Sequence, residues 1–273
     1  MNLFQAAVLG IVQGLTEFLP ISSSGHLRIV PALFGWEDPG AAFTAVIQLG
    51  TMAAVLLYFW RDIVRIISTW SRSLVQPELR GDLDARLGWY IGLGTIPIAV
   101  FGVLFQNQIE TTARDLRLIG VTLIALGLVL LWAEQVGRRN RELRGLGLRD
   151  GLLIGLAQSA ALIPGVSRSG ATITAGMFLG FTREAAARFS FLLSVPAVVL
   201  SGLFELRDIG SKGGVPGVAP TVVATVLAFV TGYLSIAWLL KYLTTHTMKI
   251  FVAYRVLLGL LILGLLAAGV IQP

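Results

Sequence analysis

Long apolar runs, each of the length needed to cross a lipid bilayer, occupy most of this chain of 273 residues. Charged residues make up only 13% of the sequence, and the mean hydropathy is +0.81. The charges gather between runs that match a hydrocarbon layer about 30 Å thick. These features exclude a soluble globule and predict an all-α integral membrane protein. The runs expected to be transmembrane helices are Ala41 to Trp60, Leu87 to Phe105, Leu118 to Glu134, Ala185 to Phe204, Val218 to Leu240 and Ile250 to Val270.

Two further apolar stretches are interrupted by polar residues near their middle. The stretch 1–35 contains the run SSSGH at 22–26, and the stretch 148–180 contains SRSG at 167–170. Two half-helices that meet at such a turn are tolerated at membrane depth only where the freed backbone groups face protein or a water-filled cavity. We therefore expect two re-entrant helix pairs in addition to six spans.

The two halves of the chain repeat a pattern. Gln13 is followed at +9, +11 and +12 by two serines and a glycine, and Gln158, 145 positions later, is followed by the same types at the same intervals. The tripeptide RDI at 61–63 recurs at 207–209, 146 positions later. A duplication is predicted, with one re-entrant pair and three spans in 1–145 and the same in 146–273, within one membrane domain. Because three is odd, the second half is inverted relative to the first.

Basic residues are unevenly divided between the two ends of these spans. Fourteen fall on one side, five fall on the other, and Arg168 and Arg255 lie inside the membrane. The positive-inside rule places the rich side in the cytoplasm and both termini outside, so that the tips of the two re-entrant pairs meet. The five outer residues are Arg28, Arg114, Arg117, Arg207 and Lys212, and the outer loops include Gln108 and Ser211. The net charge of +6 then reflects topology and not a nucleic-acid partner.

The first polar cluster contains groups that are costly to bury in lipid. Glu17, the serines at 22–24 and His26 lie within ten residues of one another, and ionisable residues inside a membrane are functional by default. A serine hydroxyl becomes a nucleophile when a base lies within hydrogen-bond reach, and the base needs an orienting or metal-binding carboxylate. The alternative is structural, with the serines capping a half-helix and Glu17 facing water. The chain has no cysteine, which excludes a cysteine phosphatase mechanism.

The second cluster has the composition of a phosphate site. Arg168 lies among glycines and hydroxyls at the predicted start of a half-helix, where free N–H groups and the helix dipole favour an anion. Arginine offers a planar bidentate fork, and glycine allows close approach of the backbone. The alternative, an arginine that reaches the membrane surface from a structural turn, requires a nearby interface. The residues expected to bind phosphate are Ser22, Ser24 and Gly25 in the first cluster and Gly165, Ser167, Ser169, Gly170 and Thr172 in the second.

At these motifs, QGLTEFLPISSSGH at 13–26 and PGVSRSGAT at 164–172, the chain resembles the undecaprenyl-diphosphate phosphatase family associated with bacitracin resistance. The resemblance implies hydrolysis of undecaprenyl diphosphate to undecaprenyl phosphate and inorganic phosphate, which recycles the lipid carrier of peptidoglycan synthesis. It further implies a bacterial inner membrane location, six spans with two re-entrant loops, a divalent cation such as Mg²⁺ or Ca²⁺, and a site facing the extracytoplasmic side.

Carried over position by position, the catalytic serine of the family falls on Ser23, its histidine on His26, its second acidic residue on Glu17 and its arginine on Arg168. Where some members have a first glutamate, this chain has Gln13, which cannot supply charge to a metal or act as a base. Glu17, with Gln13 nearby, is thus the expected metal ligand.

Three routes to the product stay open at this point. Ser23, activated by His26, attacks the terminal phosphorus; His26 is itself the nucleophile; or His26 activates a water molecule. The rival function is a polyprenyl-phosphate transporter or flippase, which an inverted repeat also supports and which would bind the lipid without cleaving it. The expected partners are a polyisoprenyl diphosphate lipid and the bilayer, and a homodimer is left open.

Overall fold

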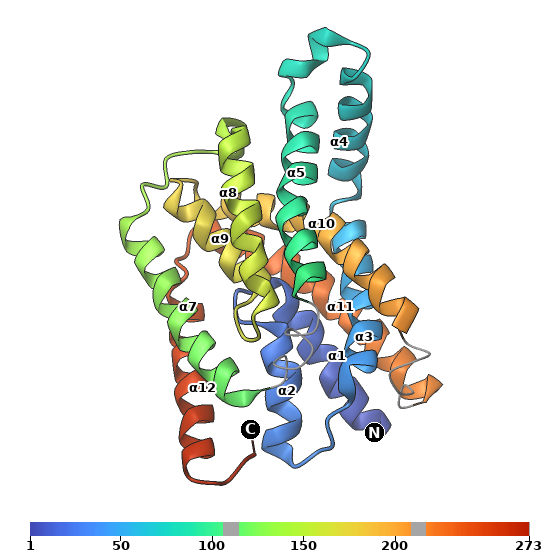
Figure 1. Ribbon diagram of the computed structural model, residues 1–273, viewed down its shortest axis with the longest axis vertical. Helices are drawn as coiled ribbons and strands as arrows, with labels where there is room; N and C mark the ends of the chain where they lie inside the picture. Colours follow the sequence, from blue (N-terminus) through green and yellow to red (C-terminus); the bar gives the residue numbers. More distant parts are fainter. Residues whose placement is uncertain (106–114, 209–216, 273) are drawn as a thin grey trace.

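The computed structural model describes residues 1–105, 115–208 and 217–272, without the side chains of 41 and 201–208, and this part of the chain is helical (Figure 1). Its helices are α1 (Leu3–Phe18), α2 (Ser23–Phe34), α3 (Gly40–Tyr58), α4 (Trp60–Ser73), α5 (Leu83–Leu104), α7 (Leu116–Val136), α8 (Leu148–Gln158), α9 (Arg168–Phe178), α10 (Arg183–Asp208), α11 (Val218–Leu243) and α12 (Lys249–Ala267). Short 3-10 helices occupy Pro77–Gly81, Leu143–Gly145 and Ser159–Leu162. The predicted all-α class is confirmed.

The breaks in the two interrupted stretches fall at the predicted polar clusters. The first stretch forms α1 and α2 with a turn at 19–22, and the second forms α8 and α9 with a connection at 159–167. Helices α8 and α9 have 11 residues each, which gives each a length of about 16 Å, roughly half of the hydrocarbon thickness. Neither is long enough to cross a membrane alone.

Four helices in the described part of the chain, α5, α7, α11 and α12, are long and apolar enough to cross a membrane, and the bent pair α3 and α4 would be a fifth. Their outward faces carry large apolar side chains such as Trp132, Leu257 and Leu260, each at least half exposed. These are the features of a multi-pass membrane protein. The finer count of six spans remains a prediction.

Helix α4 lies between the predicted spans Ala41 to Trp60 and Leu87 to Phe105, where the sequence analysis predicted no helix. It turns by 70° from α3 and packs beside α5, and the pair projects beyond the other helices (Figure 1). Ile63, Ile66 and Trp70 recur at the spacing of one helix face. The Trp70 ring covers Gly88 of α5, where a side chain would leave it no room. Arg61, Arg65 and Arg72 lie on the opposite face, and they lower the mean hydropathy of this segment so that it does not resemble a membrane span.

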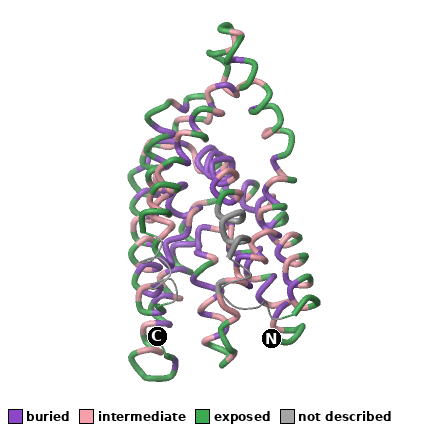
Figure 2. Tube along the Cα trace, turned by 45° about the vertical axis from the view of Figure 1, so that its right-hand side comes forward, coloured by how far each residue is buried: buried purple, intermediate pink, exposed green. Residues whose placement is uncertain are grey.

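A very close helix pair joins α1, the first helix of the chain, to α11. Gly10 and Gly14 of α1 face α11, and a Cβ atom at Gly10 would overlap the carbonyl oxygen of Ala224. Spacing small residues four apart lets two backbones approach closely, which is the main source of helix association in lipid. Buried residues accordingly concentrate in the middle of the bundle, whereas the outer faces of peripheral helices are exposed (Figure 2).

Both termini lie at one end of the molecule, opposite the projecting α4–α5 pair with its arginines (Figure 1). The side of the membrane on which the termini lie remains a prediction. Of the outer-side residues that we expected, Gln108, Arg114, Ser211, Lys212 and the Arg207 side chain lie outside the described residues.

We expect Gly10→Val to lower the midpoint of thermal unfolding in detergent by at least about 5 °C, because the added methyl groups must separate α1 from α11. Gly92→Val is the matched control, since Gly92 is also helical and a Cβ atom added there would meet no neighbour within 4 Å. Equal melting of the two variants would show that the close approach of α1 and α11 is unimportant for stability.

Candidate active site

The two polar turns have the same backbone geometry. Ser22 precedes α2 with φ 75°, and Ser167 precedes α9 with φ 70°, so both adopt a left-handed conformation that residues with a Cβ rarely take. The Ser22 hydroxyl accepts a hydrogen bond from the Gly25 N–H at 3.3 Å, and the Ser167 hydroxyl accepts one from the Gly170 N–H at 3.1 Å. Each serine thus caps its helix, and the other N–H groups of the first turn have no partner within that helix.

The turns also touch each other. The Ser169 hydroxyl donates to the Leu19 carbonyl at 3.0 Å. Ser22 and Ser24 have their hydroxyls 3.3 Å apart, and Ser167 and Ser169 repeat this contact at 3.2 Å. The structure therefore brings together the two clusters that the sequence predicts to meet.

Glu17 is the centre of the contacts between the turns. The Arg168 guanidinium, 151 positions away, donates to Glu17 Oε1 in an ion pair whose side chains are only 15% and 9% exposed. Glu17 Oε2 accepts from the Ser23 hydroxyl at 2.6 Å and from Gln13 Nε2 at 3.1 Å. A carboxylate, a hydroxyl and a guanidinium from both turns thus form one connected network.

His26 lies beside this network without bonding to Ser23. Its Nδ1 is 2.7 Å from the Ser22 carbonyl, and its Nε2 is 2.6 Å from the Tyr254 hydroxyl of α12. Because a carbonyl only accepts, Nδ1 carries the proton and Nε2 accepts from Tyr254. The two rings stack with centroids 5.5 Å apart. In this arrangement the hydrogen-bond partner of Ser23 is Glu17, and the basic nitrogen of His26 is occupied.

The remaining predicted phosphate ligands divide into two groups. Gly25 and Gly170 lie in the first turns of α2 and α9, beside the free helix starts. Gly165 has φ 82° and packs against Thr122, where no side chain would fit. Thr172 is fully buried, and its hydroxyl contacts the Arg168 carbonyl at 2.8 Å and the Ser190 hydroxyl. Gly165 and Thr172 therefore support the shape of the second turn.

Arg255 links the two turns through hydrogen bonds to their backbone carbonyls. The sequence analysis did not predict this role. This side chain of α12 is 1% exposed. Its guanidinium donates to the Pro20 carbonyl of the first turn at 3.1 Å and to the Gly165 and Val166 carbonyls of the second turn at 3.1 Å. It also donates to two carbonyls of α7, at 122 and 123. The sequence feature that could have indicated this role is the presence of an arginine inside an apolar span.

The site offers one carboxylate to a metal ion. Among the described residues, no group of three His, Asp or Glu side chains is placed to hold a metal, and both oxygens of Glu17 already accept hydrogen bonds. A cage made of protein ligands alone therefore does not fit. Mg²⁺, however, is commonly held by one or two carboxylates together with substrate phosphates and water, and Glu17 fits that arrangement.

The chain is similar to known proteins along nearly its whole length. The model of the family described as bacitracin resistance protein BacA matches residues 6–261. An "Undecaprenyl-diphosphatase 2" from Frankia casuarinae is 59% identical over 100% of this chain and 98% of its own length. Proteins named "Undecaprenyl-diphosphatase" from Nocardioides sp. and Thermobifida fusca are 56% and 55% identical, covering 99% and 100% of this chain and 99% and 93% of their own lengths.

Arg255→Lys should lower the unfolding midpoint in detergent by at least about 5 °C. An ammonium has three donors, so at least two of the five carbonyls lose their partner, at roughly 1 to 3 kcal/mol each. Arg117→Lys, at an exposed position of α7, is the control and should melt as the wild type does. A melting curve of Arg255→Lys that overlays the wild type would exclude the tethering role.

Proposed function

This chain belongs to the bacitracin resistance protein BacA family, and we propose that the network of Glu17, Ser23 and Arg168 is the site at which it dephosphorylates undecaprenyl diphosphate. The chain is an undecaprenyl-diphosphatase, as the family match and full-length relatives of that name show. Its products are undecaprenyl phosphate and inorganic phosphate. The observation that carries the site assignment is the Glu17–Arg168 ion pair, because it joins a carboxylate and a phosphate-binding cation from distant segments.

Arg168 and the two helix starts bind the diphosphate. A guanidinium presents parallel N–H donors that match two phosphate oxygens, and the free N–H groups at the starts of α2 and α9 add partial positive charge. Ser23 is the first residue of α2, and Arg168 is the first residue of α9. A phosphate held between these helix starts therefore lies next to the serine hydroxyl.

Ser23 is the nucleophile, and Glu17 accepts its proton across their 2.6 Å hydrogen bond. The Ser23 oxygen forms a bond to the terminal phosphorus, while the bond from that phosphorus to the bridging oxygen breaks and undecaprenyl phosphate leaves. Water then attacks the phosphoserine and releases inorganic phosphate, which regenerates the serine. Glu17 passes the serine proton to the departing phosphate, and the carboxylate, ionised again, takes a proton from the attacking water and returns it to the Ser23 oxygen as the phosphorus–serine bond breaks.

His26 acts through the turn that carries Ser23. Its Nδ1–H bond fixes the Ser22 carbonyl, and the strained Ser22 sets the direction of the next residue. A direct role as nucleophile or base requires Nε2 to leave the Tyr254 hydroxyl. The geometry therefore favours Glu17 over His26 as the proton acceptor.

A divalent cation, Mg²⁺ or Ca²⁺, completes the proposed site. Glu17 would hold it together with oxygens of the diphosphate, and Gln13, which bonds Glu17 at 3.1 Å, would orient the carboxylate. When bound, such an ion neutralises charge that develops on the phosphate oxygens.

The finer membrane architecture is part of the proposal. Six spans and two re-entrant pairs, related as an inverted duplication, are supported by the short lengths of α8 and α9 and by the matching serine geometry of the two turns. The arginine-rich end then faces the cytoplasm, while both termini and the opening of the site face the opposite side. This arrangement also suits a lipid transporter, and it does not require a homodimer.

Phosphate release from undecaprenyl diphosphate by purified protein in detergent, where no vectorial transport occurs, tests this mechanism. With Mg²⁺ added, Ser23→Ala should lower kcat by at least about a hundredfold, as should His26→Ala, and a chelator should reduce the wild-type rate. Turnover by Ser23→Ala near the wild-type value would exclude this serine from the mechanism. If the wild-type protein binds the lipid but releases no phosphate, the result would favour a transporter.

His26→Asn separates the two roles of the histidine in the same assay. The asparagine amide can replace the Nδ1–H bond to the Ser22 carbonyl, but it supplies neither a base nor a nucleophile. We expect it to recover at least about tenfold of the rate that His26→Ala loses. A rate as low as that of His26→Ala would assign the histidine a direct part in the chemistry.

Arg168→Lys should lower kcat/KM by about 30- to 1,000-fold, which corresponds to roughly 2 to 4 kcal/mol of transition-state stabilisation. Lysine preserves the charge that pairs with Glu17 but loses the bidentate fork that aligns the diphosphate. Arg144→Lys, at an exposed position of the 3-10 helix Leu143–Gly145, is the control and should be silent. Wild-type kcat/KM in Arg168→Ala would contradict a site built from both turns.

A further inference from the structure

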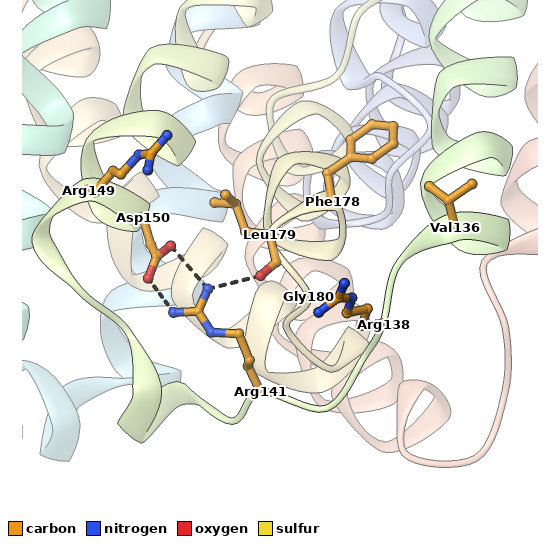
Figure 3. A pocket seen from close by; sticks show the side chains of 8 residues that line it. All are labelled: Val136, Arg138, Arg141, Arg149, Asp150, Phe178, Leu179 and Gly180. Carbon is orange, nitrogen blue, oxygen red and sulfur yellow. Dashed lines mark hydrogen bonds and ion pairs between the residues drawn. The ribbon is translucent and has the colours of Figure 1, made fainter.

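A second basic site lies at the arginine-rich end of the bundle. A cavity of about 450 Å³ opens where α7 ends, α8 begins and α9 ends, and its lining includes Arg138, Arg141, Arg149 and Asp150. Figure 3 shows these side chains around the opening. Three arginines against one aspartate give the lining a net charge of +2.

Only one of the three arginines is neutralised. Arg141 forms two hydrogen bonds with the Asp150 carboxylate, at 2.6 and 3.1 Å, and a third with the Leu179 carbonyl at 2.9 Å. Within the described residues, the guanidinium groups of Arg138 and Arg149 form no ion pair or hydrogen bond, and Figure 3 draws none. Two arginines without a bonded anion therefore line one cavity, from opposite sides in Figure 3, and the positive charge of this lining favours an anionic ligand.

The wall of the cavity on the membrane side is apolar. Val136 and Phe178 line it and are 55% and 39% exposed. The Phe178 ring packs edge-on against Trp132, with ring centroids 5.1 Å apart, and Trp132 is 59% exposed. Apolar surface thus continues from the cavity along the outside of α7, which is one of the four helices long and apolar enough to cross a membrane. The cavity has the amphipathic lining expected for a lipid headgroup.

We propose that this cavity binds a lipid phosphate monoester, with its phosphate in the basic part of the lining that Arg138 and Arg149 supply and its chain against Phe178 and Trp132. A phosphate monoester carries a charge of about −1.5 to −2 near neutral pH, which matches the net charge of the lining. Guanidinium forks fit phosphate oxygens, and basic pockets between membrane helices bind anionic headgroups. The assignment does not rest on the mechanism proposed for Ser23 and Glu17.

The cavity is separate from the active site. Helix α7 bonds the second polar turn through Thr122, whose hydroxyl donates to the Pro164 carbonyl at 2.6 Å. Val136, at the other end of that helix, lines the cavity. Fourteen residues of helix separate these positions by about 21 Å. A ligand whose phosphate lies in the cavity therefore does not touch Glu17 or Ser23.

The test is equilibrium binding of a fluorescent phosphatidic acid to the purified full-length chain in mixed detergent micelles. The double variant Arg138→Gln, Arg149→Gln should raise Kd by at least about tenfold. The double variant Arg72→Gln, Arg144→Gln removes the same charge from exposed positions at this end of the molecule, outside the cavity, and should change Kd less than about twofold. Hydrolysis of undecaprenyl diphosphate by both double variants should match the wild type, which confirms that they are folded.

Competition distinguishes the source of the phosphate. Unlabelled phosphatidic acid should displace the probe, whereas inorganic phosphate at the same concentration should not, because it lacks the chain that contacts the apolar wall. Equal weakening in the two double variants would overturn the site, since it would assign binding to general surface charge. Displacement by inorganic phosphate as effective as that by the lipid would overturn the assignment to a lipid.

Discussion

Five backbone carbonyl oxygens, from the two polar turns and from α7, converge on the guanidinium group of Arg255. Interrupting a helix inside an apolar bundle leaves carbonyl groups without their helical partners, and no water is at hand to replace those bonds. One planar group with five donors satisfies several of them at once. The close approach of the turns, and thus the meeting of Glu17 with Arg168, depends on this arrangement.

The two turns have the same backbone conformation, but their side chains differ in chemistry. Counting 145 positions on, Gln13 corresponds to Gln158, Glu17 to Leu162 and Ser23 to Arg168. The first turn therefore contributes the carboxylate and the hydroxyl, and the second contributes the cation. Gln158 is fully buried, and its side chain has no hydrogen-bond partner in the described part of the chain. Gln13, in contrast, donates a hydrogen bond to Glu17, a residue that the second turn replaces with Leu162. Each turn alone holds only half of the connected network.

Several features could not be predicted from the sequence, because each depends on contacts between segments that are far apart in the chain. Arginines masked the short apolar stripe of α4, whose burial requires α5 as a partner. Tyr254 is an ordinary interfacial residue by sequence, and its bond to His26, 228 positions away, exists only in the folded bundle. The cavity beside Arg138 and Arg149 likewise arises where three helix ends meet. Hydrophobic periodicity indicates which face of a single helix is buried, but it does not indicate which residues of other helices contact that face.

The sequence by itself determined the membrane environment and the helical class, and it indicated the candidate reactive groups. Apolar runs of membrane length and two polar breaks carry that information locally, because the cost of exposing a backbone or a charge to lipid is paid within each segment. Only the tertiary structure decided which groups are partners. It joined Ser23 to Glu17 instead of His26, set Arg168 on the same carboxylate, and turned Arg255 inward. The physical reason is that hydrogen bonds act over about 3 Å, and only packing brings residues separated by half the chain to that distance.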